Sequence, residues 1–241
     1  MTGNKPVRQV NKRKGRPVSK VRMQMLRRRR RNWLLGLALI IVLLIILIRI
    51  AVIRISPKSR VSTLTIQRDG SVRLEEVVDL KNRGVSETEV KQGVRSSIYS
   101  FFKEHGFGSA RVRRFSHVDG KLYVETCFKT IKLYQTYSGY SLYQGSAWSV
   151  EKKGFPLEDN FRKVETVTKR GSLLKSQEAL KKAEEKGDKV LVIQENIRVR
   201  LPGKIRYLSD RATHLVSEDT VDISPENKEP DSDILTCIIY Q

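Results

Sequence analysis

The chain has 241 residues and a formal net charge of +21. A balance this basic suggests a nucleic-acid protein, but residues 1–31 carry thirteen lysines and arginines and no acid, which leaves +8 for residues 32–241. A basic segment beside an apolar run is explained more simply by membrane topology and anionic lipid than by DNA. The charge distribution therefore argues against nucleic acid as the partner.

An apolar run follows the basic tail and extends from Trp33 to Ile53. As a helix it would reach about 31 Å, enough for a hydrocarbon core of about 30 Å. Arg49 lies near its far end, where the guanidinium can reach the headgroups. Trp33 stands where an interfacial aromatic residue is expected. The sequence predicts a transmembrane helix over residues 32–54.

The charges around this run predict its orientation. Five arginines precede it directly: Arg27, Arg28, Arg29, Arg30 and Arg31. The positive-inside rule then places the N-terminus in the cytoplasm and the following domain outside the cell membrane. A cleaved signal peptide is the alternative, but no small-x-small cleavage site follows the run. We expect a signal anchor with a disordered cytoplasmic tail (1–31), the transmembrane helix (32–54), a linker (55–60) and an extracytoplasmic domain (61–241).

The domain begins with two predicted hairpins. Residues 61–67 and 71–78 alternate between apolar and polar side chains around an Asp-Gly pair, and residues 110–115 and 121–133 do so around another. Two alternating runs around Asp-Gly are a strong short-range signal for a β-hairpin.

A helix is predicted between these hairpins. Ser86 and Glu89 have the spacing of a capping box, and Gly106 is placed to end the helix. Apolar residues between them fall on one helical face, so the helix is expected to pack on the sheet.

The second half of the domain is also predicted to combine strands with a helix. The expected elements are a weak strand over residues 161–169, a helix over 172–186, a long strand over 190–201, short strands at 205–208, 213–216 and 220–223, and a closing strand at 234–240. This order predicts an α+β fold, a mainly antiparallel sheet with two helices on it.

Residues 134–150 have an unusual pattern: Tyr134, Tyr137, Tyr140 and Tyr143 recur every three residues, and Trp148 follows. A spacing of three matches neither a strand face nor a helical stripe, so we expect an exposed loop and then a short strand near residues 146–150. Aromatic rings among polar neighbours suit sugar faces or lipid headgroups, which makes these five residues weak ligand candidates. Packing is the alternative, and the pattern slightly favours it.

No catalytic or metal-binding motif stands out. The three histidines lack partners at ligand spacing, and the adjacent acids Glu75 and Glu76 are expected to be solvated. The segment Gly106-Phe107-Gly108 lacks the third glycine of a dinucleotide-binding loop. We expect no catalytic residue, no metal and no cofactor, and therefore no enzyme.

The sequence also contains one candidate surface for a partner and one candidate disulfide. Arg111, Arg113 and Arg114 are expected to form a solvated face, which could also meet anionic lipid or wall polymer. Cys127 and Cys237 could pair outside the membrane, but their apolar surroundings favour two buried free thiols.

Two short motifs carry a family resemblance. Residues 64–72 read Leu-Thr-Ile-Gln-Arg-Asp-Gly-Ser-Val, and residues 197–205 read Ile-Arg-Val-Arg-Leu-Pro-Gly-Lys-Ile, with a further strand at 217–223. They resemble the opening and closing segments of LppM-type extracytoplasmic domains of Gram-positive bacteria over about residues 61–223. Such proteins are usually lipoproteins, whereas this chain has an N-terminal anchor. The resemblance implies an α+β domain outside the membrane with a lipid- or glycolipid-binding role, and it supplies no catalytic residues.

The sequence leaves a divergent envelope enzyme open as a third function, with a catalytic cluster formed only in three dimensions, and it favours two other functions. One is a single-pass membrane protein whose outer domain binds envelope lipid or glycan, with the bilayer and anionic lipid or cell-wall polymer as partners. The other is a bitopic scaffold or assembly component that binds proteins of the cell envelope.

Overall fold

The computed structural model describes residues 41–42, 60–166, 170–210, 213–223 and 235–241. The chain divides into two units, Met1–Ser56 and Pro57–Gln241. The predicted tail, almost all of the predicted transmembrane helix and most of the linker, with Arg27–Arg31 and Trp33, lie outside the described residues. Within the described ranges, no helix combines the length and the apolar character needed to cross a bilayer.

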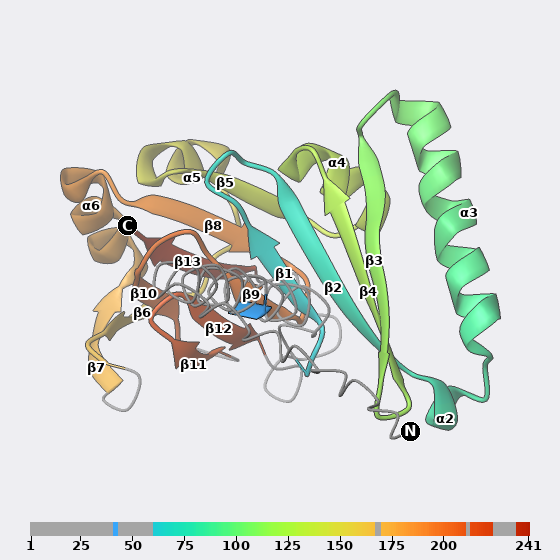
Figure 1. Cartoon of the computed structure of the whole chain (residues 1–241). Helices are drawn as coiled ribbons and strands as arrows, with labels where there is room; N and C mark the ends of the chain where they lie inside the picture. Colours follow the sequence, from blue (N-terminus) through green and yellow to red (C-terminus); the bar gives the residue numbers. More distant parts are fainter. Residues whose placement is uncertain (1–40, 43–59, 167–169, 211–212, 224–234) are drawn as a thin grey trace, which may run out of the picture. The chain divides into compact units, whose positions relative to one another are not determined.

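The larger sheet of the Pro57–Gln241 unit has seven strands in the order β11-β12-β9-β1-β2-β4-β3 (Figure 1). β1 pairs with β9 in parallel, and the other neighbours pair antiparallel. Its strands are β1 (Thr63–Ile66), β2 (Val72–Asp79), β3 (Ala110–Val118), β4 (Lys121–Phe128), β9 (Arg198–Arg200), β11 (Thr213–Ser217) and β12 (Thr220–Ile223).

The smaller sheet has six antiparallel strands in the order β5-β8-β13-β10-β6-β7. Its strands are β5 (Leu142–Ser146), β6 (Asn160–Val164), β7 (Arg170–Lys175), β8 (Lys189–Ile193), β10 (Ile205–Ser209) and β13 (Thr236–Tyr240).

The described part of the chain also contains five helices: α2 (Leu80–Arg83), α3 (Glu87–His105), α4 (Ile131–Ser138), α5 (Ala147–Lys153) and α6 (Ser176–Lys186). The predicted α+β class with mainly antiparallel pairing is confirmed. The detail of one sheet with two helices is wrong, because the strands form two sheets and more helices pack on them.

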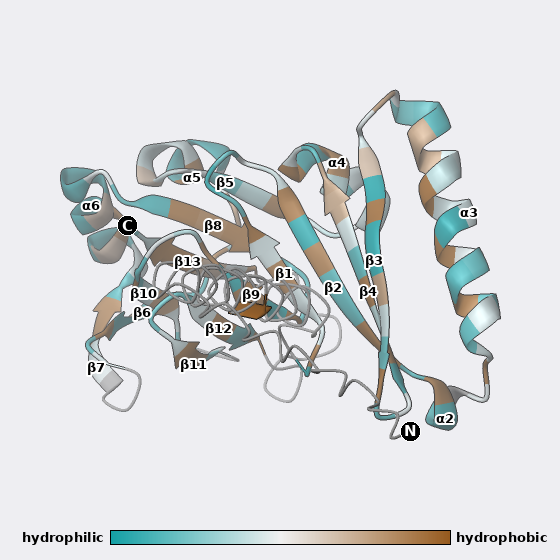
Figure 2. Cartoon of the chain, viewed as in Figure 1, coloured by the Kyte–Doolittle hydropathy of each residue, from teal (hydrophilic) through white to brown (hydrophobic). Residues whose placement is uncertain are grey.

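The six-stranded sheet is buried on both faces, which explains its continuous apolar strands. In β8, Leu191 and Ile193 point into a core shared with the seven-stranded sheet, α3 and α4, while Val190 and Val192 point into a second core beneath α5 and α6. Figure 2 shows β8 mostly hydrophobic, whereas β2 and β3 alternate. Both cores lie within residues 57–241, so this fragment is expected to fold on its own.

Local hydrogen bonds produce the elements that the sequence predicts best. The Ser86 hydroxyl accepts from the Glu89 N–H at 3.2 Å, and a Glu89 carboxylate oxygen accepts from the Ser86 N–H at 2.8 Å, completing the capping box of α3. Gly106 caps its end. The hairpins β1–β2 and β3–β4 form around Asp69-Gly70 and Asp119-Gly120, as predicted.

Several predicted boundaries are wrong because distant partners decide the structure. Residues 172–175 belong to β7, where Leu174 pairs with Phe161, so α6 begins only at Ser176. The predicted strand over 190–201 is two strands in different sheets, β8 and β9. The predicted strand over 121–133 ends at Phe128 and gives way to α4.

Cys127 and Cys237 are both free thiols, on β4 and β13. Cys237 is fully buried, as the sequence favours, and burial raises the pKa of its thiol. Cys127 is only half-buried.

The Leu-Pro-Gly-Lys motif packs against the last strand. The Gln241 N–H donates to the Lys204 carbonyl at 2.9 Å, and a Cβ added to Gly203 would lie 1.7 Å from the Gln241 carbonyl oxygen. The glycine is therefore needed because another backbone passes directly over it.

Gly203→Ala is expected to lower the free energy of unfolding by about 1–3 kcal/mol, because the methyl group must displace the backbone of Gln241, directly after the final strand. Gly93→Ala is the matched control: Gly93 lies inside α3 with nothing within 4 Å of an added Cβ, so this change should stabilise by about 0.5–1 kcal/mol. Urea unfolding of the 57–241 fragment measures both. If Gly203→Ala leaves the free energy of unfolding unchanged, the backbone of Gln241 moves away from the added methyl group without cost.

Candidate anion-binding site

Two rows of polar side chains cross the face of the seven-stranded sheet that points away from the core. Strand register aligns one row as Thr220, Arg200, Thr65, Arg73, Cys127 and Arg111, which we call the basic row. It aligns the neighbouring mixed row as Asp222, Arg198, Thr63, Glu75, Glu125 and Arg114. The basic row holds three arginines and no carboxylate.

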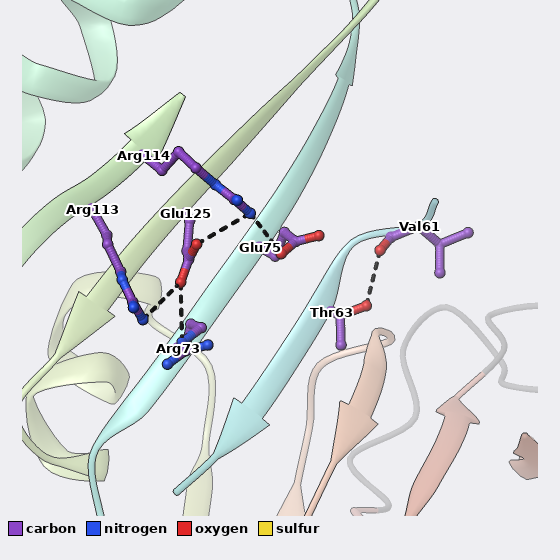
Figure 3. Close-up of polar contacts among 7 residues, drawn as sticks. All are labelled: Val61, Thr63, Arg73, Glu75, Arg113, Arg114 and Glu125. Atoms are coloured by element: carbon purple, nitrogen blue, oxygen red, sulfur yellow. Dashed lines mark hydrogen bonds and ion pairs between the residues drawn. The ribbon is translucent and has the colours of Figure 1, made fainter. Parts of the chain in front are cut away.

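Glu125 is the centre of the ion pairs in the mixed row, and its side chain is only 6% exposed. One carboxylate oxygen lies 3.1 Å from Arg73 Nε and 3.3 Å from Arg113 Nη1, and the other lies 3.4 Å from Arg114 Nη2. Figure 3 shows the three guanidinium groups converging on this carboxylate. A β-bulge between Val112 and Arg114 accounts for two successive arginines reaching it.

Glu75 takes part in the same network. It lies opposite Glu125 in the register of β2 and β4, and Arg114 Nη2 lies 3.9 Å from its carboxylate. The expectation that Glu75 is solvated is wrong, because it is 5% exposed beneath these arginines.

The other end of the mixed row is also neutralised internally. Arg198 binds Asp222 in bidentate fashion, with Nε 2.8 Å from Oδ1 and Nη2 2.5 Å from Oδ2. The hydrogen bond to Asp222 raises the pKa of Arg198. In the basic row, Arg200 Nε donates to Thr220 Oγ1 at 3.4 Å, and the Arg200 charge also acts on the Asp219 carboxylate.

A hollow of about 340 Å³ lies at one end of the basic row, between the β1–β2 turn and the start of β3. We call it the basic hollow, and its charged lining consists of Arg73, Arg111, Arg113, Lys129 and Asp69, with Cys127 among its polar walls. Four cations thus face one carboxylate.

The cations of the basic hollow are not equally engaged. Arg73 and Arg113 share Glu125, and Arg113 keeps half of its side chain exposed. Arg111 and Lys129 are exposed and make no ion pair with any residue that the structure describes. Two cations are therefore available to an anion, and two more lie beside them.

The turn that borders the hollow is held by its own hydrogen bonds. The Asp69 carboxylate accepts from the Ser71 hydroxyl at 2.7 Å and from the Ser71 N–H at 3.0 Å. These bonds lower the pKa of Asp69. Gly70 has φ +79°, the left-handed conformation that glycine supplies in this tight turn.

No family model, curated protein or solved structure matches the chain.

The five aromatic candidates are not brought together on one surface. Tyr134 is 1% exposed in the core between the sheets, where its hydroxyl donates to Glu195. Tyr137 packs on Phe128 at 5.0 Å, and Tyr143 packs on Phe155 at 5.2 Å beside the other core. Tyr140 and Trp148 are 46% and 55% exposed.

The structure of this segment also differs from the expected loop and strand. Residues 131–138 form α4, residues 142–146 form β5, and residues 147–153 form α5. The expectation of an exposed loop is wrong for Tyr134, which is buried, while Tyr137 and Tyr143 are half-buried. A ligand role for the exposed Tyr140 and Trp148 stays a prediction.

Sequence reasoning found part of the basic hollow and missed the rest. Of the three arginines that it singled out, Arg111 and Arg113 line the hollow and Arg114 does not. Arg73, Cys127 and Lys129 join these two only through the pairing of β2, β4 and β3. The one usable signal was the alternation of β2 around Asp-Gly, which puts Arg73 on the same face as Glu75.

Elsewhere among the described residues, the structure is less suited to binding a charged ligand. A hollow of about 470 Å³ beside Gly187 contains Asp188, but this carboxylate is 4% exposed and lies 3.2 Å from Arg206 Nε. Glu184 and Lys189 are the other charged residues in its lining, so it holds a single cation, and Asp188 is already paired with Arg206. Among the described residues, no cluster of three His, Cys, Asp or Glu side chains is arranged to hold a metal ion.

Proposed function

We propose that the chain is a single-pass membrane protein, with a cytoplasmic N-terminus, whose domain outside the membrane binds an anionic, phosphate-bearing group of envelope lipid or glycan. The apolar run after a basic tail supports the topology, and the resemblance to LppM-type domains supports the envelope setting. The observation that carries the binding function is the basic hollow, where Arg111 and Lys129 have no ion-pair partner among the described residues.

The chemistry of the hollow suits a phosphate. Guanidinium groups donate paired, charge-assisted hydrogen bonds to phosphate oxygens, and lysine adds a point charge. Arg73 and Arg113 already hold Glu125 between them, so their orientation is set before a ligand arrives. Such preorganisation lowers the cost of binding.

Cys127 offers a direct measurement of occupancy, because its thiol lies in the wall of the hollow while Cys237 is buried. Glycerol phosphate is expected to slow the alkylation of Cys127 in the 57–241 fragment, and uncharged glycerol is not. Arg111→Gln should weaken this protection by about tenfold, equal to roughly 1.4 kcal/mol of charge-assisted hydrogen bonding.

Lys181→Gln is the control, since it removes an exposed cation from α6 on the other sheet and should leave protection unchanged. Protection that is equal in the parent and in Arg111→Gln, or absent in both, would contradict the anion site. The scaffold function would then be the better explanation of the domain.

A further inference from the structure

The loop between α3 and β3 holds an aromatic ring out in solvent. Phe107 is 95% exposed, and the glycines on both sides have positive φ, +87° at Gly106 and +79° at Gly108. The ring of Phe107 meets the edge of the Phe102 ring at 5.9 Å between centroids.

Phe107 belongs to a small aromatic surface, which we call the aromatic tip: Tyr99, Phe102 and Phe107. Tyr99 is 58% exposed and stacks on Phe102 at 6.3 Å. An exposed phenylalanine beside a second exposed ring is a concentration of apolar surface that a soluble domain normally buries.

One lysine packs on the aromatic tip, and further cations lie next to the loop that carries it. The Lys103 ammonium lies 4.7 Å from the centre of the Tyr99 ring. The Lys129 N–H donates to the Ser109 carbonyl at 3.0 Å, which places Lys129 beside the loop, and Gly108 itself lines the basic hollow with Arg111. One exposed carboxylate, Glu104, lies nearby, 3.8 Å from His105.

This combination matches a lipid surface better than a protein groove. The aromatic tip protrudes instead of forming a cleft, and aromatic rings with neighbouring lysines and arginines suit the boundary between headgroups and acyl chains. Anionic headgroups attract such cations, so charge complementarity and apolar burial act in the same direction.

We propose that the aromatic tip inserts into an anionic lipid bilayer while the basic hollow takes a headgroup phosphate. This inference rests on the proposed anion site and adds that the ligand is presented by a membrane. Insertion of one ring and contact by a few cations make weak, reversible binding, which becomes effective when an anchor keeps the domain close to the bilayer.

The test uses the 57–241 fragment and vesicles of phosphatidylcholine with or without phosphatidylglycerol. The fragment is expected to sediment with the anionic vesicles only. Phe107→Ser should weaken this partitioning by about tenfold or more, because it removes the inserting ring. Leu173→Ser, which removes a 53% exposed apolar side chain from β7 on the other sheet, should leave partitioning unchanged.

A spectroscopic readout reports insertion directly. In a Trp148→Phe background, Phe107→Trp places the only tryptophan of the fragment at the tip. Its emission should shift to shorter wavelength with anionic vesicles and stay unchanged with glycerol phosphate. An unshifted emission, or a Phe107→Ser variant that binds vesicles as the parent does, would overturn the insertion.

The two proposals fail differently. Phe107→Ser should still show protection of Cys127 by glycerol phosphate, whereas Arg111→Gln should lose it. Protection without vesicle binding would leave the anion site standing and point to a soluble phosphate polymer as its ligand. Vesicle binding without protection would reject the hollow as the headgroup site.

Discussion

Replacing Tyr134 by alanine is expected to lower the free energy of unfolding by about 3–5 kcal/mol, the loss typical of a truncated core aromatic. The ring is 1% exposed, and its centre lies 5.3 Å from that of Phe128. Its hydroxyl donates to Glu195, so the substitution also removes a hydrogen bond to a carboxylate. Urea unfolding of the 57–241 fragment at neutral pH measures the loss.

Tyr140→Ala is the matched control, because Tyr140 is 46% exposed and should change stability by no more than about 0.5 kcal/mol. Tyr134→Phe separates the ring from the hydroxyl. Burial raises the pKa of Glu195 and the Tyr134 hydroxyl opposes this, so removing the hydroxyl should raise the pKa of Glu195 further. Similar losses for Tyr134→Ala and Tyr140→Ala would contradict the burial seen here.

The four tyrosines show why a regular spacing in the sequence does not predict a shared surface. Tyr134 and Tyr137 share a face of α4, where both pack on Phe128, but the spacing of three does not continue as one face, because α4 ends at Ser138 and β5 begins at Leu142. Tyr134 is buried by Phe128, which is close in sequence, but also by α3 and the six-stranded sheet. Burial by distant elements leaves no local periodicity to detect.

Elements that depend on nearby residues were predicted well. The capping box of Ser86 and Glu89 and the two Asp-Gly turns close within a few residues, so their hydrogen bonds can be inferred from spacing alone. The start of α6 could not, since residues 172–175 also carry helix-compatible side chains and only their pairing with β6 makes them a strand.

The candidate site was likewise predictable only where its residues are close in sequence. Arg111, Arg113 and Arg114 are neighbours in sequence, and their charge was visible. The basic hollow also needs Arg73 and Lys129, which come from the other strands of the sheet and from the segment after β4. Register across antiparallel strands brings them together, and a small error in register would point their side chains elsewhere.

Glu125→Gln is expected to move stability and ligand affinity in opposite directions. The change removes the charge that Arg73, Arg113 and Arg114 share, and two of these guanidinium side chains are only 20% and 19% exposed. Arg114 would keep Glu75 at 3.9 Å, but Arg73 would lose the carboxylate at 3.1 Å, which should lower the free energy of unfolding by about 3 kcal/mol. The same change frees Arg73 and Arg113 in the basic hollow, so protection of Cys127 by glycerol phosphate should strengthen several-fold.

Glu218→Gln provides the comparison. It breaks an exposed pair with Lys204, in which Glu218 is 71% exposed, and should cost no more than about 1 kcal/mol without affecting Cys127. Urea unfolding and the alkylation rate test both variants on the same fragment. A Glu125→Gln protein as stable as the parent would show that these arginines are hydrated without the Glu125 carboxylate. Weaker protection of Cys127 in a folded Glu125→Gln protein would mean that Glu125 aids anion binding by orienting the arginines. This effect would then outweigh the repulsion between its charge and the anion.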